Sequence, residues 1–306
     1  MSPVRLVAAA PTPMRPDGDL DLDTIPRLVD HLVSDGVDGI FCNGSTGEGE
    51  SLAPEERKAV ARAFVEANAG RVRVWVQVGA NSLRVARELA EHAADIGADA
   101  IAATPPSYFK PATVSEVVAC LGEIAAAAPD RPLLYYHFPG MTGVSLDLVE
   151  LMRAAREAIP TFTGAKLSDA DPAVLAACSK IGEGRLEAFW GRDDTLLAGL
   201  EAGATEAIGA TYSFATPAFR RVIAAHQAGD GEEAERWQGR CARMVDIQMR
   251  HGGFPAFKAT MALLDLDCGP VRLPQRALPP ADIEAMRAEL DAIGFFDWAR
   301  PVSYTH

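Results

Sequence analysis

Lys166 is the residue whose type and position are best suited to chemistry, because it ends an apolar run that begins at Phe162. Burial lowers the pKa of an amine by penalising its charged form, and the free amine then attacks carbonyl carbon to form an imine. The chain holds 5 Lys against 24 Arg, and a guanidinium cannot form such an imine. The ordinary alternative is a lysine whose stem reaches from a strand end to solvent.

A second candidate site is the turn Gly44-Ser45-Thr46-Gly47-Glu48, which follows another apolar run. Two glycines around two hydroxyl residues allow a tight turn that aims N–H and O–H donors into one concavity. Such a turn binds a carboxylate without using a charged side chain. An ordinary glycine-rich turn between a strand and a helix is the alternative interpretation.

Two further segments end apolar runs in the same way. Tyr136 lies in Tyr-Tyr-His-Phe-Pro-Gly-Met-Thr-Gly, where a phenol can donate or accept a proton, although a core or subunit-contact aromatic is equally consistent. Asp193 and Asp194 lie in Trp-Gly-Arg-Asp-Asp, where paired carboxylates suit the hydroxyls of a polyol. A helix N-terminus, which favours aspartate, is the alternative for this pair.

These segments recur at the ends of short apolar runs that alternate with helical patterns, as in repeated βα units. The expected strands are 6–10, 39–42, 73–78, 100–103, 133–137, 162–166, 186–190 and 207–210. The expected helices between and after them are 24–34, 54–69, 83–96, 114–127, 146–159, 172–181, 195–202 and 217–228. Eight regular units favour a closed (β/α)₈ TIM barrel of the α/β class over an open doubly wound sheet.

Three more helical patterns follow the last unit, at 232–250, 256–264 and 280–293. We therefore expect a catalytic barrel domain over residues 1–228 and a C-terminal helical extension over residues 229–306 that packs on it. Ser82 and Thr113 are expected to cap the helices that follow them, and Gly36, Gly97 and Gly203 to end helices.

Composition excludes several other classes of protein. A net charge of −13, from 29 basic and 42 acidic residues, repels a phosphate backbone, so we expect no nucleic-acid partner. No run approaches the 18 apolar residues that cross a bilayer, so we expect no membrane partner and a soluble, cytoplasmic protein. The cysteines and histidines are widely scattered and predict no metal site; the five cysteines are 42, 120, 178, 241 and 268.

Taken together, Gly-Ser-Thr-Gly-Glu, Tyr-His-Phe-Pro and Gly-Ala-Lys, in this order over the barrel, resemble the superfamily of pyruvate-dependent class I aldolases. That superfamily contains N-acetylneuraminate lyase and dihydrodipicolinate synthase. The resemblance implies that Lys166 forms the Schiff base, that Tyr136 shuttles a proton, and that Ser45 and Thr46 hold the pyruvate carboxylate. It also implies no metal and no cofactor beyond the covalent imine, which acts as the electron sink.

The resemblance further implies a homotetramer, a dimer of dimers, in which an aromatic residue after the fourth strand reaches a neighbour's site. Tyr108 or Phe109 would be that aromatic here. The dihydrodipicolinate synthase branch carries an arginine that grips an acidic second substrate, and Met141 stands in that place. A thioether forms no bidentate pair with a carboxylate, so the sialic acid lyase branch fits better.

Carried over from that branch, the contacts to the sugar chain fall on Ser168, Gly191, Asp193 and Asp194. Asp194 replaces the usual glutamate, and Ala210 the usual serine. The expected activity is reversible cleavage of N-acetylneuraminate to pyruvate and N-acetylmannosamine. The alternatives are a dihydrodipicolinate synthase-like enzyme, an aldolase or dehydratase for 2-keto-3-deoxy sugar acids, and a non-catalytic barrel that binds a keto acid.

Overall fold

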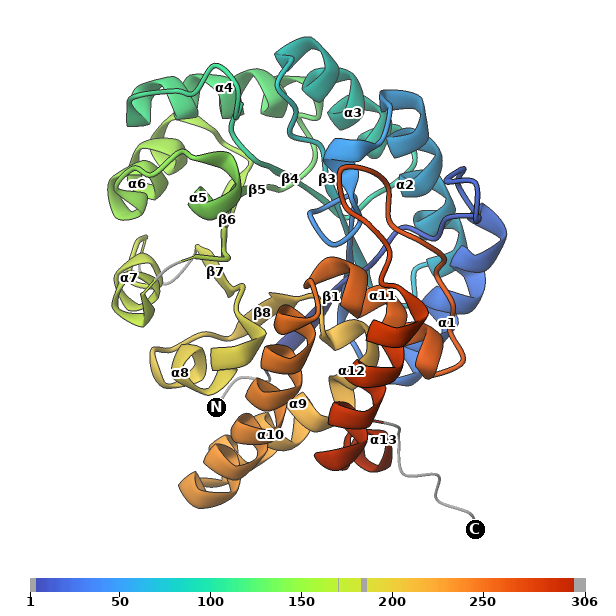
Figure 1. Ribbon diagram of the computed structural model, residues 1–306. Coiled ribbons are helices and arrows are strands. Elements are labelled where there is room, and N and C mark those ends of the chain that lie inside the picture. The colour runs from blue at the N-terminus through green and yellow to red at the C-terminus, as the bar shows by residue number, and fades with distance from the viewer. Residues whose placement is uncertain (1–3, 170, 183–185, 300–306) are drawn as a thin grey trace.

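The computed structural model describes residues 4–169, 171–182 and 186–299, and its centre is a closed parallel barrel (Figure 1). Each strand pairs with the next in the chain, and the eighth pairs with the first. The strands are β1 (Arg5–Ala9), β2 (Gly39–Cys42), β3 (Arg73–Gln77), β4 (Ala100–Ala103), β5 (Leu133–His137), β6 (Phe162–Leu167), β7 (Glu187–Trp190) and β8 (Glu206–Gly209). The predicted (β/α)₈ barrel is confirmed, and the open-sheet alternative is excluded.

Helices surround the strands because each carries one apolar face that is buried against the sheet. They are α1 (Ile25–Ser34), α2 (Pro54–Asn68), α3 (Leu83–Asp95), α4 (Val114–Ala127), α6 (Leu148–Ala158), α7 (Pro172–Cys178), α8 (Leu196–Glu201) and α9 (Tyr212–Ala228). The Ser82 side chain accepts a hydrogen bond from the Val85 N–H, and Thr113 accepts one from the Glu116 N–H. Both predicted helix caps are therefore present.

The largest boundary difference concerns α9, which begins at Tyr212 rather than at the predicted Pro217. Ala215 has non-helical dihedrals, so a kink separates the first turn from the rest of the helix. The proline suggested a start because it suits a first helical turn, and it does stand just after the kink. The short helix α5 (Pro139–Thr142) was not predicted, and the predicted helix to residue 181 ends at Cys178.

A bulge in β6 determines the direction of its last side chains. Leu133 pairs with Phe162, but Leu134 pairs with Gly164, so Thr163 is the extra residue. A Cβ atom at Gly164, where φ is +155°, would lie 1.8 Å from the Glu187 carbonyl oxygen, so only glycine permits this approach of β7. After the bulge, Lys166 pairs with Tyr136, which belongs to the apolar cluster inside the barrel.

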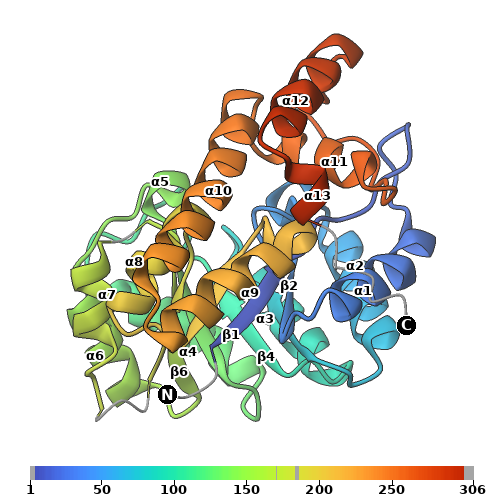
Figure 2. The same ribbon diagram turned by 90° about the horizontal axis from the view of Figure 1, so that it is seen from below.

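The C-terminal helices pack on one side of the barrel, next to α8 and α9 (Figures 1 and 2). They are α10 (Gly231–Arg250), α11 (Phe254–Leu263), α12 (Pro280–Ala292) and α13 (Phe295–Trp298). Their apolar side chains join the same buried cluster that fills the space between strands and outer helices. The division at residue 228/229 stays a prediction, and residues 300–306 of the expected extension lie outside the described residues.

None of the helices in the described ranges has the length and apolar character needed to span a bilayer.

Candidate active site

A cavity of about 470 Å³ opens at the C-terminal ends of the barrel strands. This is the face at which barrel enzymes build their active sites. Most of the sequence-predicted site residues line it: Ser45, Thr46, Tyr136, Lys166, Ser168, Gly191, Asp193 and Asp194. Residues that are up to 149 positions apart in the chain therefore meet in one hollow, because parallel strands bring their carboxyl ends to the same face.

Lys166 lies on the floor of this cavity with only 4% of its surface exposed. Its Nζ is 4.2 Å from the centroid of the Tyr136 ring and 4.5 Å from that of Phe41. Aromatic faces attract a cation and also accommodate the neutral amine. The side chain therefore does not extend into bulk solvent, which was the ordinary alternative for a lysine at a strand end.

Tyr136 connects the lysine to the hydroxyl turn. Its phenol oxygen lies 3.3 Å from Ser45 Oγ, and its ring stacks on Phe138 with centroids 5.9 Å apart. The ring is buried, but both Tyr136 and Ser45 line the cavity. A phenol and a hydroxyl that share a hydrogen bond beside an amine can pass a proton between a bound molecule and the turn.

The turn after β2 is held in a conformation that ordinary side chains adopt rarely. Asn43 and Glu48 both have positive φ, at 58° and 54°. A Cβ at Gly49 would lie 2.0 Å from the Asn43 carbonyl oxygen, so the turn closes only over a glycine. Thr12 also donates to the Gly47 carbonyl at 2.6 Å. The turn is thereby fixed with Ser45 and Thr46 facing the cavity.

A buried ion pair ties this turn to the C-terminal helices. Lys258 Nζ of α11 lies 2.8 Å from Glu48 Oε1, and both side chains are almost fully buried. Glu48 Oε2 also accepts the Arg272 N–H at 2.8 Å, and Lys258 donates to the Pro270 carbonyl at 2.7 Å. Burial lowers the pKa of Lys258, while the charge of Glu48 raises it. The C-terminal segment thus fixes one wall of the site.

Asp193 follows β7 in another wall of the cavity and is buried against the end of β8. Its Oδ2 accepts the Thr211 N–H at 2.8 Å and the Thr211 hydroxyl at 2.6 Å. Burial raises the pKa of the Asp193 carboxyl, whereas the Thr211 bonds and the charge of Lys166 oppose that rise. A Cβ at Gly209 would lie 1.8 Å from Asp193 Oδ1, so β8 needs glycine at this point to admit the carboxylate.

Asp194 lies at the cavity rim and forms a two-point ion pair with Arg192. Arg192 Nη2 lies 2.8 Å from Asp194 Oδ2, and Nε lies 3.4 Å from Oδ1. Gly191 and Ser168 complete this side. A Cβ at Gly191 would lie 2.6 Å from Ser168 Oγ, so the two segments can pack this closely only at a glycine.

Tyr108 does not line this cavity, although the sequence placed it among the substrate-binding residues. It is 77% exposed and packs edge-to-face against Phe109, which is 86% exposed. The backbone at Tyr108 is held by Asn81 Oδ1, which accepts the Tyr108 N–H at 2.8 Å. Within one chain Tyr108 is therefore separate from the other candidates, and its expected role at a neighbour's site stays a prediction.

Sequence reasoning did not select several residues that line the cavity. Thr211 follows β8 and could have been found by inspecting every strand end. The apolar wall from the C-terminal helices carried no such signal; it consists of Val245, Met249, Phe254 and Phe257. Met141 and Ala210, which distinguish the branches of the superfamily, both line the cavity.

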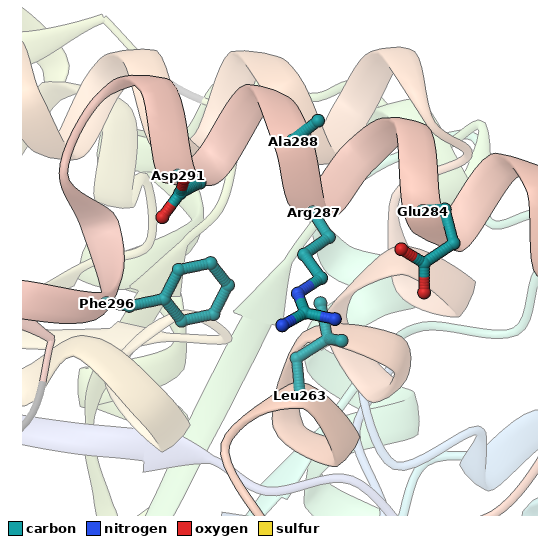
Figure 3. A pocket seen from close by; sticks show the side chains of 6 residues that line it. All are labelled: Leu263, Glu284, Arg287, Ala288, Asp291 and Phe296. Carbon is teal, nitrogen blue, oxygen red and sulfur yellow. The ribbon is translucent and has the colours of Figure 1, made fainter.

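A second hollow, of about 490 Å³, lies on α11, α12 and α13 and contains none of the candidate residues (Figure 3). Glu284, Arg287 and Asp291 project into it from α12, beside Phe296. Its lining is remote in sequence from every strand end, and its described residues include no lysine that could form an imine. Within the ranges that the structure covers, no three His, Cys, Asp or Glu residues gather as a metal site would require.

A (β/α)₈ barrel with a buried lysine at the C-terminal ends of its strands is the arrangement of a class I aldolase. The comparison with protein families agrees with this class. The chain belongs to the dihydrodipicolinate synthetase family, whose model matches residues 2–293. It is 40% identical to N-acetylneuraminate lyase of Gallus gallus over 293 residues, which covers 94% of this chain and 95% of that protein. The family resemblance drawn from the sequence is thereby confirmed.

Solved structures agree with this family. N-acetylneuraminate lyase of Proteus mirabilis matches with a TM-score of 0.93 and 32% identity, covering 95% of this chain and 99% of that one. A catalytic lysine mutant of the Ruminococcus gnavus sialic acid aldolase matches with a TM-score of 0.90 and 27% identity, covering 96% of both chains. The barrel and its C-terminal helices are therefore shared with structures of sialic acid aldolases.

Proposed function

We propose that this protein is a class I aldolase that cleaves N-acetylneuraminate reversibly to pyruvate and N-acetylmannosamine through an imine on Lys166. The observation that carries the proposal is the burial of the Lys166 amine in the cavity against the ring of Tyr136, whose phenol oxygen lies 3.3 Å from Ser45 Oγ. Imine chemistry needs a buried amine, a group that transfers protons and a site for the carboxylate of the keto acid. Lys166, Tyr136 and the turn with Ser45 would supply these three.

The bond changes follow from that arrangement. Lys166 Nζ attacks the C2 carbonyl of the open-chain keto acid, water leaves, and an iminium forms. The Tyr136 oxygen accepts the proton of the C4 hydroxyl while its own phenol proton passes through the Ser45 hydroxyl to the substrate carboxylate, and the C3–C4 bond breaks; the same route later returns the proton to C3. The electron pair of that bond forms the enamine, and C4 leaves as the aldehyde of N-acetylmannosamine. Protonation at C3 and hydrolysis then release pyruvate and the free amine.

The two ends of the substrate would be held by opposite walls. Ser45 and Thr46 would donate to the pyruvate carboxylate, while Ser168, Gly191, Asp193 and Asp194 would contact the polyol chain. Carboxylates accept hydrogen bonds from several hydroxyls at once. The names of the relatives reported above support this substrate. Met141 in the cavity wall argues against an acidic second substrate, because it cannot pair with a carboxylate.

Borohydride trapping tests the imine directly. Reduction in the presence of pyruvate is expected to add one three-carbon adduct to Lys166, located by peptide mass spectrometry. Lys166→Ala should abolish both the adduct and turnover, whereas Lys180→Ala, at an exposed lysine, should change neither. An unmodified wild-type mass after reduction would refute the proposal.

A second candidate function, cleavage or dehydration of a 2-keto-3-deoxy sugar acid, is favoured by one observation. Ala210 offers no hydroxyl to the substrate, and the Asp194 carboxylate is already engaged by Arg192. Both features reduce the number of hydrogen bonds that the site can form with a long polyol chain. Values of kcat/KM for N-acetylneuraminate and for six-carbon keto sugar acids, measured by pyruvate release, separate the two candidates.

We also propose a cytoplasmic homotetramer built as a dimer of dimers. The exposed pair Tyr108 and Phe109 supports it, because two large aromatic rings in solvent are characteristic of a contact surface. Light scattering of the purified protein is expected to give the mass of four chains. Tyr108→Ala together with Phe109→Ala should shift it to smaller species, and a wild-type monomer would refute the tetramer.

A further inference from the structure

Gln238 of α10 holds the segment that carries Asp193 and Asp194 by its backbone. Its Nε2 donates to the Asp193 carbonyl at 3.2 Å and to the Asp194 carbonyl at 2.9 Å. Its Oε1 accepts the Leu197 N–H at 2.9 Å. Both hydrogens of this amide nitrogen therefore form hydrogen bonds with the same short segment, Asp193–Asp194.

The residues at the two cap positions do not perform this task. The helix α8 begins without a side-chain cap from Thr195, and the turn that precedes it has none from Arg192. The first N–H groups of a helix have no partner within it, so Gln238 satisfies one of them from a distant helix. In the same step it fixes the two carbonyls that determine where the Asp193 and Asp194 side chains leave the backbone.

The position of Gln238 separates it from the substrate. It does not line the cavity, and it belongs to α10, which packs against the turn that carries Asp193 and Asp194. Lys166 and Tyr136 lie on β6 and β5, and Ser45 lies in the turn after β2. The Nε2 hydrogen bonds of Gln238 therefore act on the site through the Asp193–Asp194 backbone.

We propose that Gln238 is a positioning residue that sets the affinity of the site for the polyol end of its substrate, without acting on the pyruvate end. The inference rests on the proposed function, since it assigns Asp193 and Asp194 to the polyol. Displaced carboxylates would lose hydrogen bonds to substrate hydroxyls, whereas imine formation by pyruvate would stay as it is.

The test compares two variants with a matched control. Gln238→Met removes all three hydrogen bonds at nearly constant volume. Gln238→Glu keeps the acceptor for Leu197 but turns a second oxygen toward the two carbonyls. Glu235→Met places the same side chain on an exposed position of the same helix. The measurements are the KM for N-acetylneuraminate and the pyruvate concentration that half-saturates borohydride trapping on Lys166.

We expect Gln238→Met to raise the KM for N-acetylneuraminate about tenfold, because the loss of one or two hydrogen bonds to the substrate weakens binding by about this factor. Gln238→Glu should raise it at least as much, because oxygen then faces oxygen. A residue that only caps α8 would behave differently, since a carboxylate caps a helix well and Gln238→Glu would match the wild type. The half-saturating pyruvate concentration should change less than about twofold, and Glu235→Met should change neither.

The outcomes are separable. Wild-type protein that traps no pyruvate refutes the proposed function itself. Wild-type trapping together with an unchanged KM in both Gln238 variants overturns the role of Gln238. A parallel rise of KM and of half-saturating pyruvate also overturns it, because the whole site would then have moved. If Gln238→Met does not fold, Gln238→Glu, which keeps the helix cap, carries the test.

Discussion

The ion pair between Lys258 and Glu48 should be one of the most sensitive points of the fold. Lys258→Met leaves the Glu48 carboxylate buried, with the Arg272 N–H as its remaining partner. Breaking a buried pair by removing one charge typically costs about 3–5 kcal/mol, since the other charge loses its compensation and does not regain water. An exposed ion pair contributes at most about 1 kcal/mol, so burial decides the magnitude here.

Urea unfolding measures this cost, provided that the slope of the transition stays unchanged. The control is Lys180→Met, the same substitution at an exposed lysine, which should shift the free energy of unfolding by less than about 0.5 kcal/mol. The double variant Lys258→Met with Glu48→Gln removes both charges. It should be less destabilised than the sum of the single variants, by about 0.5–3 kcal/mol.

The same substitution should also act on the site. Glu48 belongs to the turn that carries Ser45 and Thr46, so a displaced turn should raise the pyruvate concentration needed for half-maximal trapping on Lys166. A loss below about 1 kcal/mol in Lys258→Met would refute the reasoning, because the pair would then behave as a solvent-exposed one. Additive single variants would refute it as well.

Three further outcomes are expected. Ala210→Ser restores a hydroxyl to the cavity wall and should raise kcat/KM for N-acetylneuraminate about 2- to 10-fold, measured by pyruvate release, whereas no gain would remove this residue from the substrate contacts. Gly209→Ala should displace the Asp193 carboxylate and raise the KM for the same substrate while pyruvate trapping persists; equal loss of both would contradict this. Burial raises the pKa of Asp193, so between its unfolded value of 3.8 and its higher folded value the native state holds the extra proton and loses stability as the pH rises. The free energy of unfolding, measured in urea, should therefore fall with rising pH in that window for the wild type relative to Asp193→Asn. A rise of this difference with pH would contradict a raised pKa of Asp193.

Local pattern was sufficient for the strands and for the residues that end them. Apolar runs of four to six residues predicted every barrel strand within one residue at each end, because buried parallel strands must be apolar on both faces. The barrel rule then selected Lys166, Tyr136 and Ser45, which do meet in one cavity. Glycine marked helix ends correctly, because Gly36, Gly97 and Gly203 follow α1, α3 and α8 with positive φ. Proline was the less reliable guide, since Pro217 follows a kink inside α9.

The sequence by itself determined the class of fold and the residue types available for chemistry, since strand periodicity and the placement of lysine, tyrosine and hydroxyl groups are local properties. Only the tertiary structure decided which groups from distant segments contact those residues and hold them in place. Gln238, Lys258 and the apolar wall of α10 and α11 come from segments with no pattern that points to a site. Their roles depend on how helices pack across the barrel mouth, and packing is a property of the whole chain rather than of any stretch of it.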